Sequence, residues 1–327
     1  MGYKVKDLVI LTGAGFTRNF GGFLGKDITA MIFNSPLVQT SDNLRKLMTD
    51  IPDFESAYFE VFNNKIYSQS ERVNFQKAVE EAYKLLDDTI KHWVFDGKNE
   101  PNTYFLFGKL FTLLIGASNE RGMFFTLNQD LFMERQCGYR PPGAARFPET
   151  FYGVGGRELE SKDFVTLSDY EIEETVEREI ESNAGSQYIK LHGSYGWLSN
   201  DGSHRMIVGK NKLDDINSIP LLKYYFEIFK RTILEGNKKK ILIIGYGFQD
   251  PHINEVLLEG VEKHETKIFV INPSDLGSFV ENLANSTPPC SKLLKGLGGY
   301  YPNVLKDILP PNQSFTPVFE NLLKSLS

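Results

Sequence analysis

Cysteine is scarce in this sequence, with Cys137 and Cys290 the only two among 327 residues. Two thiols cannot form a four-cysteine zinc site, and a disulfide framework is not expected at this chain length, so we predict ordinary thiols in a reducing compartment. Positive charge is not in surplus either, because 36 Lys and Arg face 42 Asp and Glu. The chain therefore lacks the bulk positive charge that supports nucleic-acid binding, and no direct nucleic-acid signature replaces it.

Long apolar runs are also missing. No run reaches the length that spans a membrane, and the first residues, MGYKVKDLVIL, lack the apolar centre of a secretory signal. We therefore expect a cytoplasmic protein with no membrane partner.

Short apolar runs are present and recur along the chain. They lie in residues 5–12 and in the stretches GMFFTLNQD, QYIKLHGS, KKKILIIGYGFQD and TKIFVINPSD. Amphipathic helical patterns, IPLLKYYFEIFKRTILEG and PHINEVLLEGVEKH, stand between the later runs. Buried strands separated by helices predict an α/β fold, Rossmann-like, with a mainly parallel sheet and helices on both faces.

The segment from about residue 27 to 118 has a helical pattern that is too long for one crossover. One stripe within it, at three- and four-residue spacing, consists of Val73, Phe75, Val79, Tyr83, Leu86, Ile90 and Trp93. A further helix is expected over 103–118, loops and short hairpins over 138–186, and helical segments after 275. We predict a single domain, 1–327, with an inserted helical subdomain at about 27–118.

Polar or glycine-rich turns follow the predicted strands. The turns are GAGFTRN, TLNQD, LHGS, GYGFQDP and INPSD. Ligands of an open parallel sheet bind outside the carboxyl ends of the strands. Several strands that end in such residues therefore indicate one binding site at that edge.

The first of these turns has two interpretations. Gly13 and Gly15 lack Cβ atoms, which suits either a plain tight turn or a backbone cradle for a pyrophosphate next to a helix start. Arg18 stands where the dinucleotide fingerprint has its third glycine, and no Gly-Lys-Ser/Thr follows, so a Walker-type loop is not expected. Asp130 is similarly open to two readings, a helix cap or a ligand contact.

His192, at the end of a predicted strand, is either a satisfied core histidine or a general base. His252 is a weaker candidate, because it falls in the first turn of a helix that Asp250 caps and Pro251 opens. The other histidines are expected to face solvent: His92, His204 and His264. No spacing of His, Cys and Asp suggests a metal site, so none is predicted.

Taken in order, GAGFT, TLNQD, LHGS, GYGFQD and VIN resemble the NAD-binding pattern of the sirtuins. The resemblance spans nearly the whole chain, and the segment 27–118 matches least. It implies NAD⁺ as the substrate, with Asn128 and His192 as catalytic residues and His192 as the base. It also implies the binding residues Gly13, Ala14, Gly15, Thr17, Asp130, Gly245, Gly247 and Asn272.

Two departures from the sirtuin pattern affect the expected activity. The chain lacks the two Cys-x-x-Cys pairs that hold the structural zinc of sirtuin deacylases, and NFGGFLG replaces their Pro-Asp-Phe-Arg segment. In this it is more similar to the sirtuin-like NAD⁺ hydrolases of bacterial anti-phage defence. That resemblance implies a standalone effector that forms a homo-oligomer, with a HerA-type ATPase or another defence protein as a possible partner.

The sequence therefore predicts an NAD⁺ glycohydrolase, or NAD⁺ nucleosidase, that yields nicotinamide and ADP-ribose. The alternatives are a protein deacylase of sirtuin type, a non-catalytic module that binds NAD⁺ or ADP-ribose as a signal, and a dehydrogenase on a dinucleotide fold. The missing zinc cysteines disfavour the deacylase, and the missing third glycine disfavours the dehydrogenase. No metal is required by the predicted chemistry.

Overall fold

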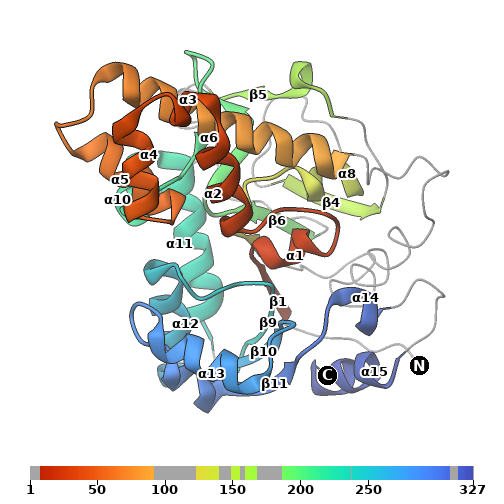
Figure 1. Ribbon diagram of the computed structural model, residues 1–327. Coiled ribbons are helices and arrows are strands. Elements are labelled where there is room, and N and C mark those ends of the chain that lie inside the picture. Colours follow the sequence, from red (N-terminus) through yellow and green to blue (C-terminus); the bar gives the residue numbers. More distant parts are fainter. Residues whose placement is uncertain are drawn as a thin grey trace.

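The computed structural model describes residues 8–91, 123–139, 149–154, 159–167, 186–236, 238–309 and 316–326. Its strands form two sheets (Figure 1). The large sheet has the strand order β11-β10-β9-β1-β2-β6-β4-β3, and the small one has the order β5-β7-β8.

The strands from β11 to β6 in this order run parallel to one another. Their bounds are β1 (Leu8–Thr12), β2 (Met123–Thr126), β6 (Ser186–Lys190), β9 (Lys240–Ile244), β10 (Lys267–Ile271) and β11 (Leu297–Tyr301). An antiparallel extension follows, made of β4 (Glu149–Val154) and β3 (Cys137–Tyr139). The small sheet contains β5 (Val165–Thr166), β7 (Gly193–Leu198) and β8 (His204–Met206).

Numbered along the chain, the parallel strands have the order 3-2-1-4-5-6, which is that of the Rossmann fold. The order reverses between β1 and β9. These two strands pair in register from Leu8 with Lys240 to Thr12 with Ile244, so they end at the same level. The turns that follow them meet at this switch point, where Rossmann-like folds bind ligands.

The segment between β1 and β2 is helical as far as it is described. Its helices are α1 (Ala14–Arg18), α2 (Gly25–Asn34), α3 (Pro36–Gln39), α4 (Asp42–Asp50), α5 (Phe54–Asn63) and α6 (Gln69–Ile90). Side-chain caps set their starts: Ser41 caps α4, Asp53 caps α5, and Ser68 forms a capping box with Glu71 on α6.

The predicted stripe on α6 is largely confirmed. Its members Phe75, Val79, Tyr83, Leu86 and Ile90 are buried. Val73, however, is a large exposed side chain, because it lies outside the face that packs on α2, α3 and α5. Trp93 and the predicted helix over 103–118 lie outside the described residues.

The remaining helices flank the later strands. They are α8 (Phe132–Gln136), α10 (Lys212–Ser218), α11 (Pro220–Leu234), α12 (Pro251–Lys263), α13 (Leu276–Asn285), α14 (Leu305–Ile308) and α15 (Pro317–Leu326), with 3-10 turns η2 (Ser161–Asp163) and η3 (Ser291–Gly296). The predicted helices over 219–236 and 251–264 are confirmed as α11 and α12. No helix in the described part of the chain is long and apolar enough to cross a membrane.

Each face of the large sheet carries its own hydrophobic core. On β1, Leu8 and Ile10 belong to the core shared with α2–α6 and α15, whereas Val9 and Leu11 belong to the core shared with α11–α13. Alternation of side chains along a strand produces this division. The predicted Rossmann-like α/β fold, with helices on both faces, is confirmed (Figure 1).

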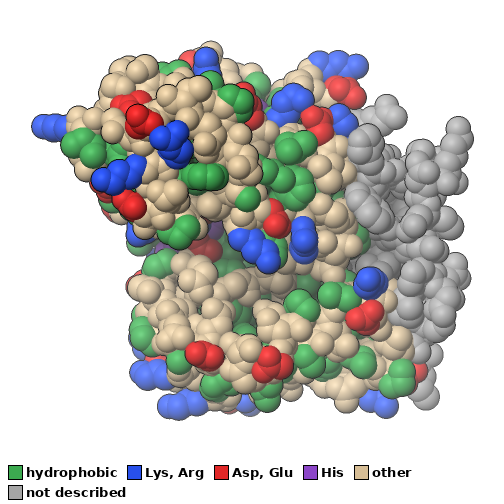
Figure 2. Space-filling model, viewed as in Figure 1, with side chains coloured by type: hydrophobic (Ala, Val, Ile, Leu, Met, Phe, Trp, Pro, Cys, Tyr) green, Lys and Arg blue, Asp and Glu red, His purple; other side chains and the backbone are tan. Residues whose placement is uncertain are grey.

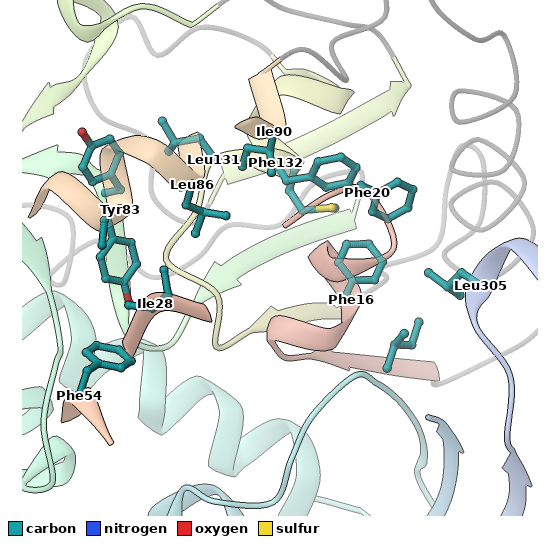
Figure 3. Close-up of a cluster of buried hydrophobic side chains, with 14 of the residues drawn as sticks. Phe16, Phe20, Ile28, Phe54, Tyr83, Leu86, Ile90, Leu131, Phe132 and Leu305 are labelled. Carbon is teal, nitrogen blue, oxygen red and sulfur yellow. The ribbon is translucent and has the colours of Figure 1, made fainter. Parts of the chain in front are cut away.

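Aromatic rings anchor the short helix α1 to the first core. Figure 3 shows Phe16, Phe20 and Phe132 gathered together. The rings of Phe20 and Phe132 stack with centroids 4.3 Å apart, and Phe16 meets Phe132 edge-on at 6.1 Å. Burial of each ring stabilises the fold by about 1.5–3 kcal/mol, which fixes the turn before α1 on the sheet.

Three strands outside the segment 138–186 were not predicted: β7, β8 and β11. β11 lies where the sequence suggested only helical segments, and β7 directly follows the predicted strand that ends near His192. In β11 the strand signal is weak because of Gly298 and Gly299. A Cβ at Gly298 would lie 2.6 Å from the ring of Phe269, so packing of that ring requires the glycine. Of the segment 138–186, β3 and β4 form the predicted kind of hairpin pairing, and much of the rest lies outside the described residues.

Candidate functional site

A cavity of about 530 Å³ opens at the carboxyl ends of β1, β2, β6, β9 and β10. The face of the molecule is hollowed between the helices α2–α6 and the turns after the strands (Figure 2). Nine of the ten predicted site residues line it: Gly13, Ala14, Gly15, Asn128, Asp130, His192, Gly245, Gly247 and Asn272. The tenth, Thr17, lies directly behind two of them.

The turns after β1 and β9 form one side of the cavity, which we call the glycine wall: Gly13, Gly15 and Gly245. The backbone N–H of Gly15 donates to the carbonyl of Gly245 over 2.9 Å. A Cβ on Gly15 would lie 2.7 Å from the Cα of Gly245, and a Cβ on Gly245 would lie 2.2 Å from the N of Phe16. Gly245 also has a φ of +64°. The two turns therefore pack backbone against backbone, and this packing by itself requires the three glycines.

Thr17 connects the turn after β1 to the turn after β2. Its hydroxyl donates to Oδ2 of Asp130 over 2.9 Å and accepts from Nδ2 of Asn128 over 2.7 Å. The backbone N–H of Asn128 in turn donates to the hydroxyl of Thr126, and this hydroxyl also accepts a hydrogen bond from the hydroxyl of Thr12. Asn128 is thus held in place by its backbone and its amide nitrogen.

Asp130 has the capping role that the sequence left open. Its Oδ1 accepts from the backbone N–H of Phe132 at the start of α8, over 3.0 Å. Its backbone carbonyl accepts from the buried ammonium of Lys190, which also contacts Oε1 of Glu134 at 2.6 Å. Both carboxylate oxygens of Asp130 have a partner within the protein, and each keeps a lone pair that a ligand could use.

His192 sits in the turn between β6 and β7 and is 97% buried. Gln129 fixes this turn, because its amide nitrogen donates to the carbonyls of His192 (3.1 Å) and Ile207 (2.6 Å). Gly193 follows with a φ of +76°, and a Cβ there would lie 2.2 Å from the carbonyl of Arg205. The glycine after the histidine is therefore needed to turn the chain back into β7.

His252 is a histidine that sequence reasoning ranked too low, and Glu55 and Lys212 are site residues that it missed. Its Nε2 lies 3.0 Å from Nε2 of His192, and it is equally buried, against the ring of Phe226. Burial lowers the pKa of His252 to about 4 and lowers that of His192 well below its usual range, so both imidazoles are neutral near pH 7. The run Asp250-Pro251-His252 could have indicated His252 as a site residue, because it places the histidine directly after a turn that ends a strand.

Asp250 and its neighbours complete what we call the charged wall: His192, His252, Asp250, Lys212 and Glu55. Lys212 contacts Oδ1 of Asp250 at 2.7 Å and Oε2 of Glu55 at 2.8 Å. Burial would raise the pKa of Asp250, but Lys212 and the imidazoles outweigh burial and lower it to about 2. Asp250 and Pro251 do occupy the predicted N-cap and first helical positions of α12, but the carboxylate binds Lys212 and makes no capping bond.

The charges around Lys212 are strongly coupled. Burial would lower the pKa of Lys212, but Asp250 and Glu55 raise it above its usual range. The pKa of Glu55 is raised by burial in spite of Lys212. Among the described lining residues, Lys212 is the one cation, and the carboxylates are Asp53, Glu55, Asp130 and Asp250.

The residues at the outer part of the cavity are more open. Gly247 is exposed, and its carbonyl accepts from Nδ2 of Asn282 over 3.0 Å. Asn272 uses its Oδ1 to accept from the backbone N–H of Ser274, over 2.9 Å, which shapes the turn after β10. The opposite wall is apolar and comes from α2, α5 and α6, with Ile28, Phe54 and Leu86 (Figure 3).

His204 and His264 lie apart from this site. His204 was expected to face solvent, but it is half-buried, and its ring stacks on Tyr195 with centroids 4.2 Å apart. His264 is half-buried at the C-terminal end of α12. His92 lies outside the described residues.

Three potential metal ligands meet in the charged wall, although no sequence spacing indicated them. One ligand atom from each of His192, Asp250 and His252 lies within 4.8 Å of the other two. The residues come from two separate strand-end turns and a helix start, so their proximity depends on the fold.

A family model described as a SIR2-like domain matches residues 122–288, just over half of the chain. No curated protein matches the chain. Among solved structures, a serine-to-alanine mutant of a Sir2 homologue in complex with ADP-ribose is 14% identical, with a TM-score of 0.44, and covers 98% of this chain and 92% of its own. A histidine-to-asparagine mutant of a Sir2 homologue, also in complex with ADP-ribose, is 14% identical with a TM-score of 0.43, and the match covers 98% of this chain and 92% of that one. A Sir2 homologue in complex with NAD is 13% identical with a TM-score of 0.38, and the match covers 98% of this chain and 91% of that one.

Proposed function

The chain belongs to the SIR2-like domain family, and from that premise we propose that it is an NAD⁺ glycohydrolase that releases nicotinamide and ADP-ribose. One observation carries the proposal. Asn128 and His192, which follow different strands, line the same cavity at the switch point of the sheet. An amide and an imidazole that converge there suit a reaction at a single carbon of a bound dinucleotide.

The dimensions and lining of the cavity support this choice of substrate. A volume of about 530 Å³ lies within the range of small-molecule and cofactor sites, about 300–1,000 Å³. The backbone N–H groups of the glycine wall donate to backbone carbonyls, but the wall has no side chains that would keep a diphosphate away from it. The charged wall instead holds two carboxylates, Asp250 and Glu55, against one cation, Lys212, and an excess of negative charge favours a cation. We therefore place the diphosphate at Gly15 and Gly247 and the nicotinamide end at His192 and Asp250.

The chemistry then follows from the charge of the substrate. Nicotinamide in NAD⁺ is a cationic pyridinium, and cleavage of its bond to the anomeric carbon returns the electron pair to the ring, which leaves neutral. The positive charge moves to an oxocarbenium-like ribose, which nearby carboxylates stabilise. Water adds to the anomeric carbon, and its proton passes to His192. The sum is NAD⁺ plus water giving nicotinamide, ADP-ribose and a proton.

Asn128 has a positioning and binding role in this scheme. Its amide nitrogen is fixed by Thr17, so its carbonyl oxygen remains to orient water or a ribose hydroxyl without adding charge. Thr17 itself is buried and acts through Asn128 and Asp130. Asp130 and Asn272 are proposed to contact the nicotinamide amide and the adenosine ribose, respectively.

The test is incubation of NAD⁺ with the chain, both alone and together with the product of its neighbouring gene, with the products separated by chromatography. We expect nicotinamide and ADP-ribose in equal amounts, and a loss of about 10²–10⁴-fold in rate for His192→Ala, the range for removal of a general base. Asn128→Ala should also abolish turnover. His264→Ala, at the far end of α12, is the matched control, and thermal unfolding checks that all variants fold.

Unchanged turnover in both Asn128→Ala and His192→Ala would overturn the site assignment. The deacylase would instead be supported if the chain deacetylates an acetyl-lysine peptide and releases no nicotinamide when that peptide is left out. Binding of NAD⁺ without any products would support the non-catalytic module.

We further infer that the protein is an anti-phage effector, held inactive until an assembly or a partner such as a HerA-type ATPase activates it. The support is the absence of the deacylase Cys-x-x-Cys pairs and Pro-Asp-Phe-Arg segment, in which the sequence resembles sirtuin-like defence hydrolases, and the damage that unregulated loss of NAD⁺ would cause. NAD⁺ turnover should rise when the chain is mixed with the product of its neighbouring gene. Strong turnover by the isolated monomer would contradict this inference.

A further inference from the structure

The contact between His192 and His252 is unusual for a buried pair. The two Nε2 atoms face each other at 3.0 Å, and both side chains are more than 95% buried. Two neutral imidazoles can form a single N–H···N hydrogen bond in this arrangement, with one ring as donor and the other as acceptor. One ring nitrogen from each histidine and a carboxylate oxygen of Asp250 lie within 4.8 Å of one another. Two imidazoles and one carboxylate form a ligand set that suits first-row transition metals.

The second ring nitrogen of His192 has the partner that a metal ligand requires. The backbone of Leu127 partly offsets the effect of burial by raising the pKa of His192, as a hydrogen-bond acceptor near a ring N–H does. Because Nε2 faces His252, Nδ1 is the ring nitrogen left for that contact. Metal-binding histidines almost always use their other ring nitrogen in this way, which fixes the tautomer with a free lone pair on the metal-facing nitrogen. The Nε2 of His192 is therefore already oriented as a ligand atom.

The cluster is also connected to the outside. His192 and Asp250 line the cavity, and His252 lies beside them, so an ion can enter from the cavity without opening the core. In a tetrahedral zinc site with bonds of about 2.0–2.1 Å, ligand atoms lie about 3.3 Å apart. The two nitrogens are already near that separation, and the Asp250 carboxylate has to move toward them.

Lys212 is the competing cation, since its ammonium lies 2.7 Å from Oδ1 of Asp250. Lys212 does not depend on Asp250 alone, because Oε2 of Glu55 lies 2.8 Å from the same ammonium. A metal ion can therefore take the Asp250 carboxylate while Lys212 keeps Glu55. The competition predicts a site of moderate affinity that becomes tighter when the lysine charge is removed.

From this geometry we propose that His192, His252 and Asp250 bind one divalent first-row transition-metal ion, for which Zn²⁺ is the probe. Three protein ligands leave the fourth position open to water from the cavity. The ion bridges the two Nε2 atoms and replaces the hydrogen bond between them.

The ion also regulates the reaction, a consequence that rests on the proposed function. The Nε2 lone pair of His192 faces His252 in the metal-free protein, and that contact has to break before the lone pair accepts the proton of the attacking water; a bound metal occupies the lone pair and prevents this. Zn²⁺ should therefore inhibit nicotinamide release, and a chelator should restore it. Metal binding itself needs no NAD⁺, so it is measured independently of turnover.

The experiment is a calorimetric titration of Zn²⁺ into the full chain, freed of metal by a chelator and without NAD⁺. We expect one site in the wild type, and an affinity at least about tenfold weaker in both His252→Gln and His192→Gln. His264→Gln, which removes an imidazole from the other end of α12, should bind like the wild type. Lys212→Gln should bind more tightly. Circular dichroism establishes that each variant is folded, and the two ligand variants lie on different elements, so one suffices if the other does not fold.

Equal Zn²⁺ binding by wild type, His252→Gln and His192→Gln would overturn the proposal, as would the absence of a site in the wild type. Weaker Zn²⁺ binding by Lys212→Gln than by the wild type would contradict the proposed competition between Lys212 and the metal ion for Asp250. If Zn²⁺ binds as expected but the chain releases no nicotinamide, the metal site stands and the proposed function fails. If the chain hydrolyses NAD⁺ and Zn²⁺ at saturation leaves the rate unchanged, the regulatory consequence fails.

Discussion

The two walls of the cavity differ in what the fold requires of them. In the glycine wall, each missing Cβ makes room for the backbone of the facing turn, so these glycines would be needed even if no ligand were bound. In the charged wall, two histidines and an aspartate are buried beside a lysine whose side chain is 11% exposed, and burial of such groups costs free energy that apolar side chains would not. The charged wall is therefore the stronger indication of function, although the glycines resemble the better-known motif.

The largest effect that this comparison predicts is on stability, at the glycine wall. Gly245→Ala forces a side chain into a φ of +64° and places its Cβ 2.2 Å from the N of Phe16. We expect a loss of about 4 kcal/mol in the free energy of unfolding, measured by urea denaturation. Gly247→Ala, two residues along in the same turn, places its Cβ at an ordinary contact distance of 3.8 Å from Cγ of Gln249 and should change stability by less than about 0.5 kcal/mol. Similar losses in both variants would show that the glycines do not differ in packing.

A smaller effect is predicted for the charged wall. Lys212→Gln leaves the carboxylates of Asp250 and Glu55 without their shared cation, and the amide replaces only part of the lost interaction. We expect a loss of about 2 kcal/mol in the free energy of unfolding. The control is Lys263→Gln, which removes an exposed ion pair with Glu259 on α12 and should leave the unfolding midpoint unchanged. If Lys212→Gln is as stable as the wild type, the buried charges do not depend on one another as described.

Much of the fold followed from the sequence because the parallel strands are short apolar runs that end abruptly in polar turns. The carboxyl ends of parallel strands share one edge, so Asn128 and His192 could be placed in one cavity without coordinates. β11 could not be predicted, because packing of the Phe269 ring replaces apolar side chains with glycines in that strand. Val73 has the helical spacing of a buried residue. Its burial depends on which face of α6 packs against other helices, and spacing along the sequence does not determine that.

Most of the charged wall could not be predicted from the sequence, for a related reason. Glu55 starts a helix of the segment between β1 and β2, Lys212 starts α10, and His252 starts α12. A helix start is a normal place for polar residues, so each has a local explanation. Only the packing of distant segments shows that these side chains meet. Periodicity gives no information on such long-range partners.

The most direct test of the central claim is a crystal structure of the His192→Ala variant with NAD⁺ bound, since this variant should bind the substrate without cleaving it. Our account predicts the diphosphate at Gly15 and Gly247, and the nicotinamide ribose beside Asn128 and the vacated imidazole position. A dinucleotide bound in the reverse direction, or outside this cavity, would contradict it.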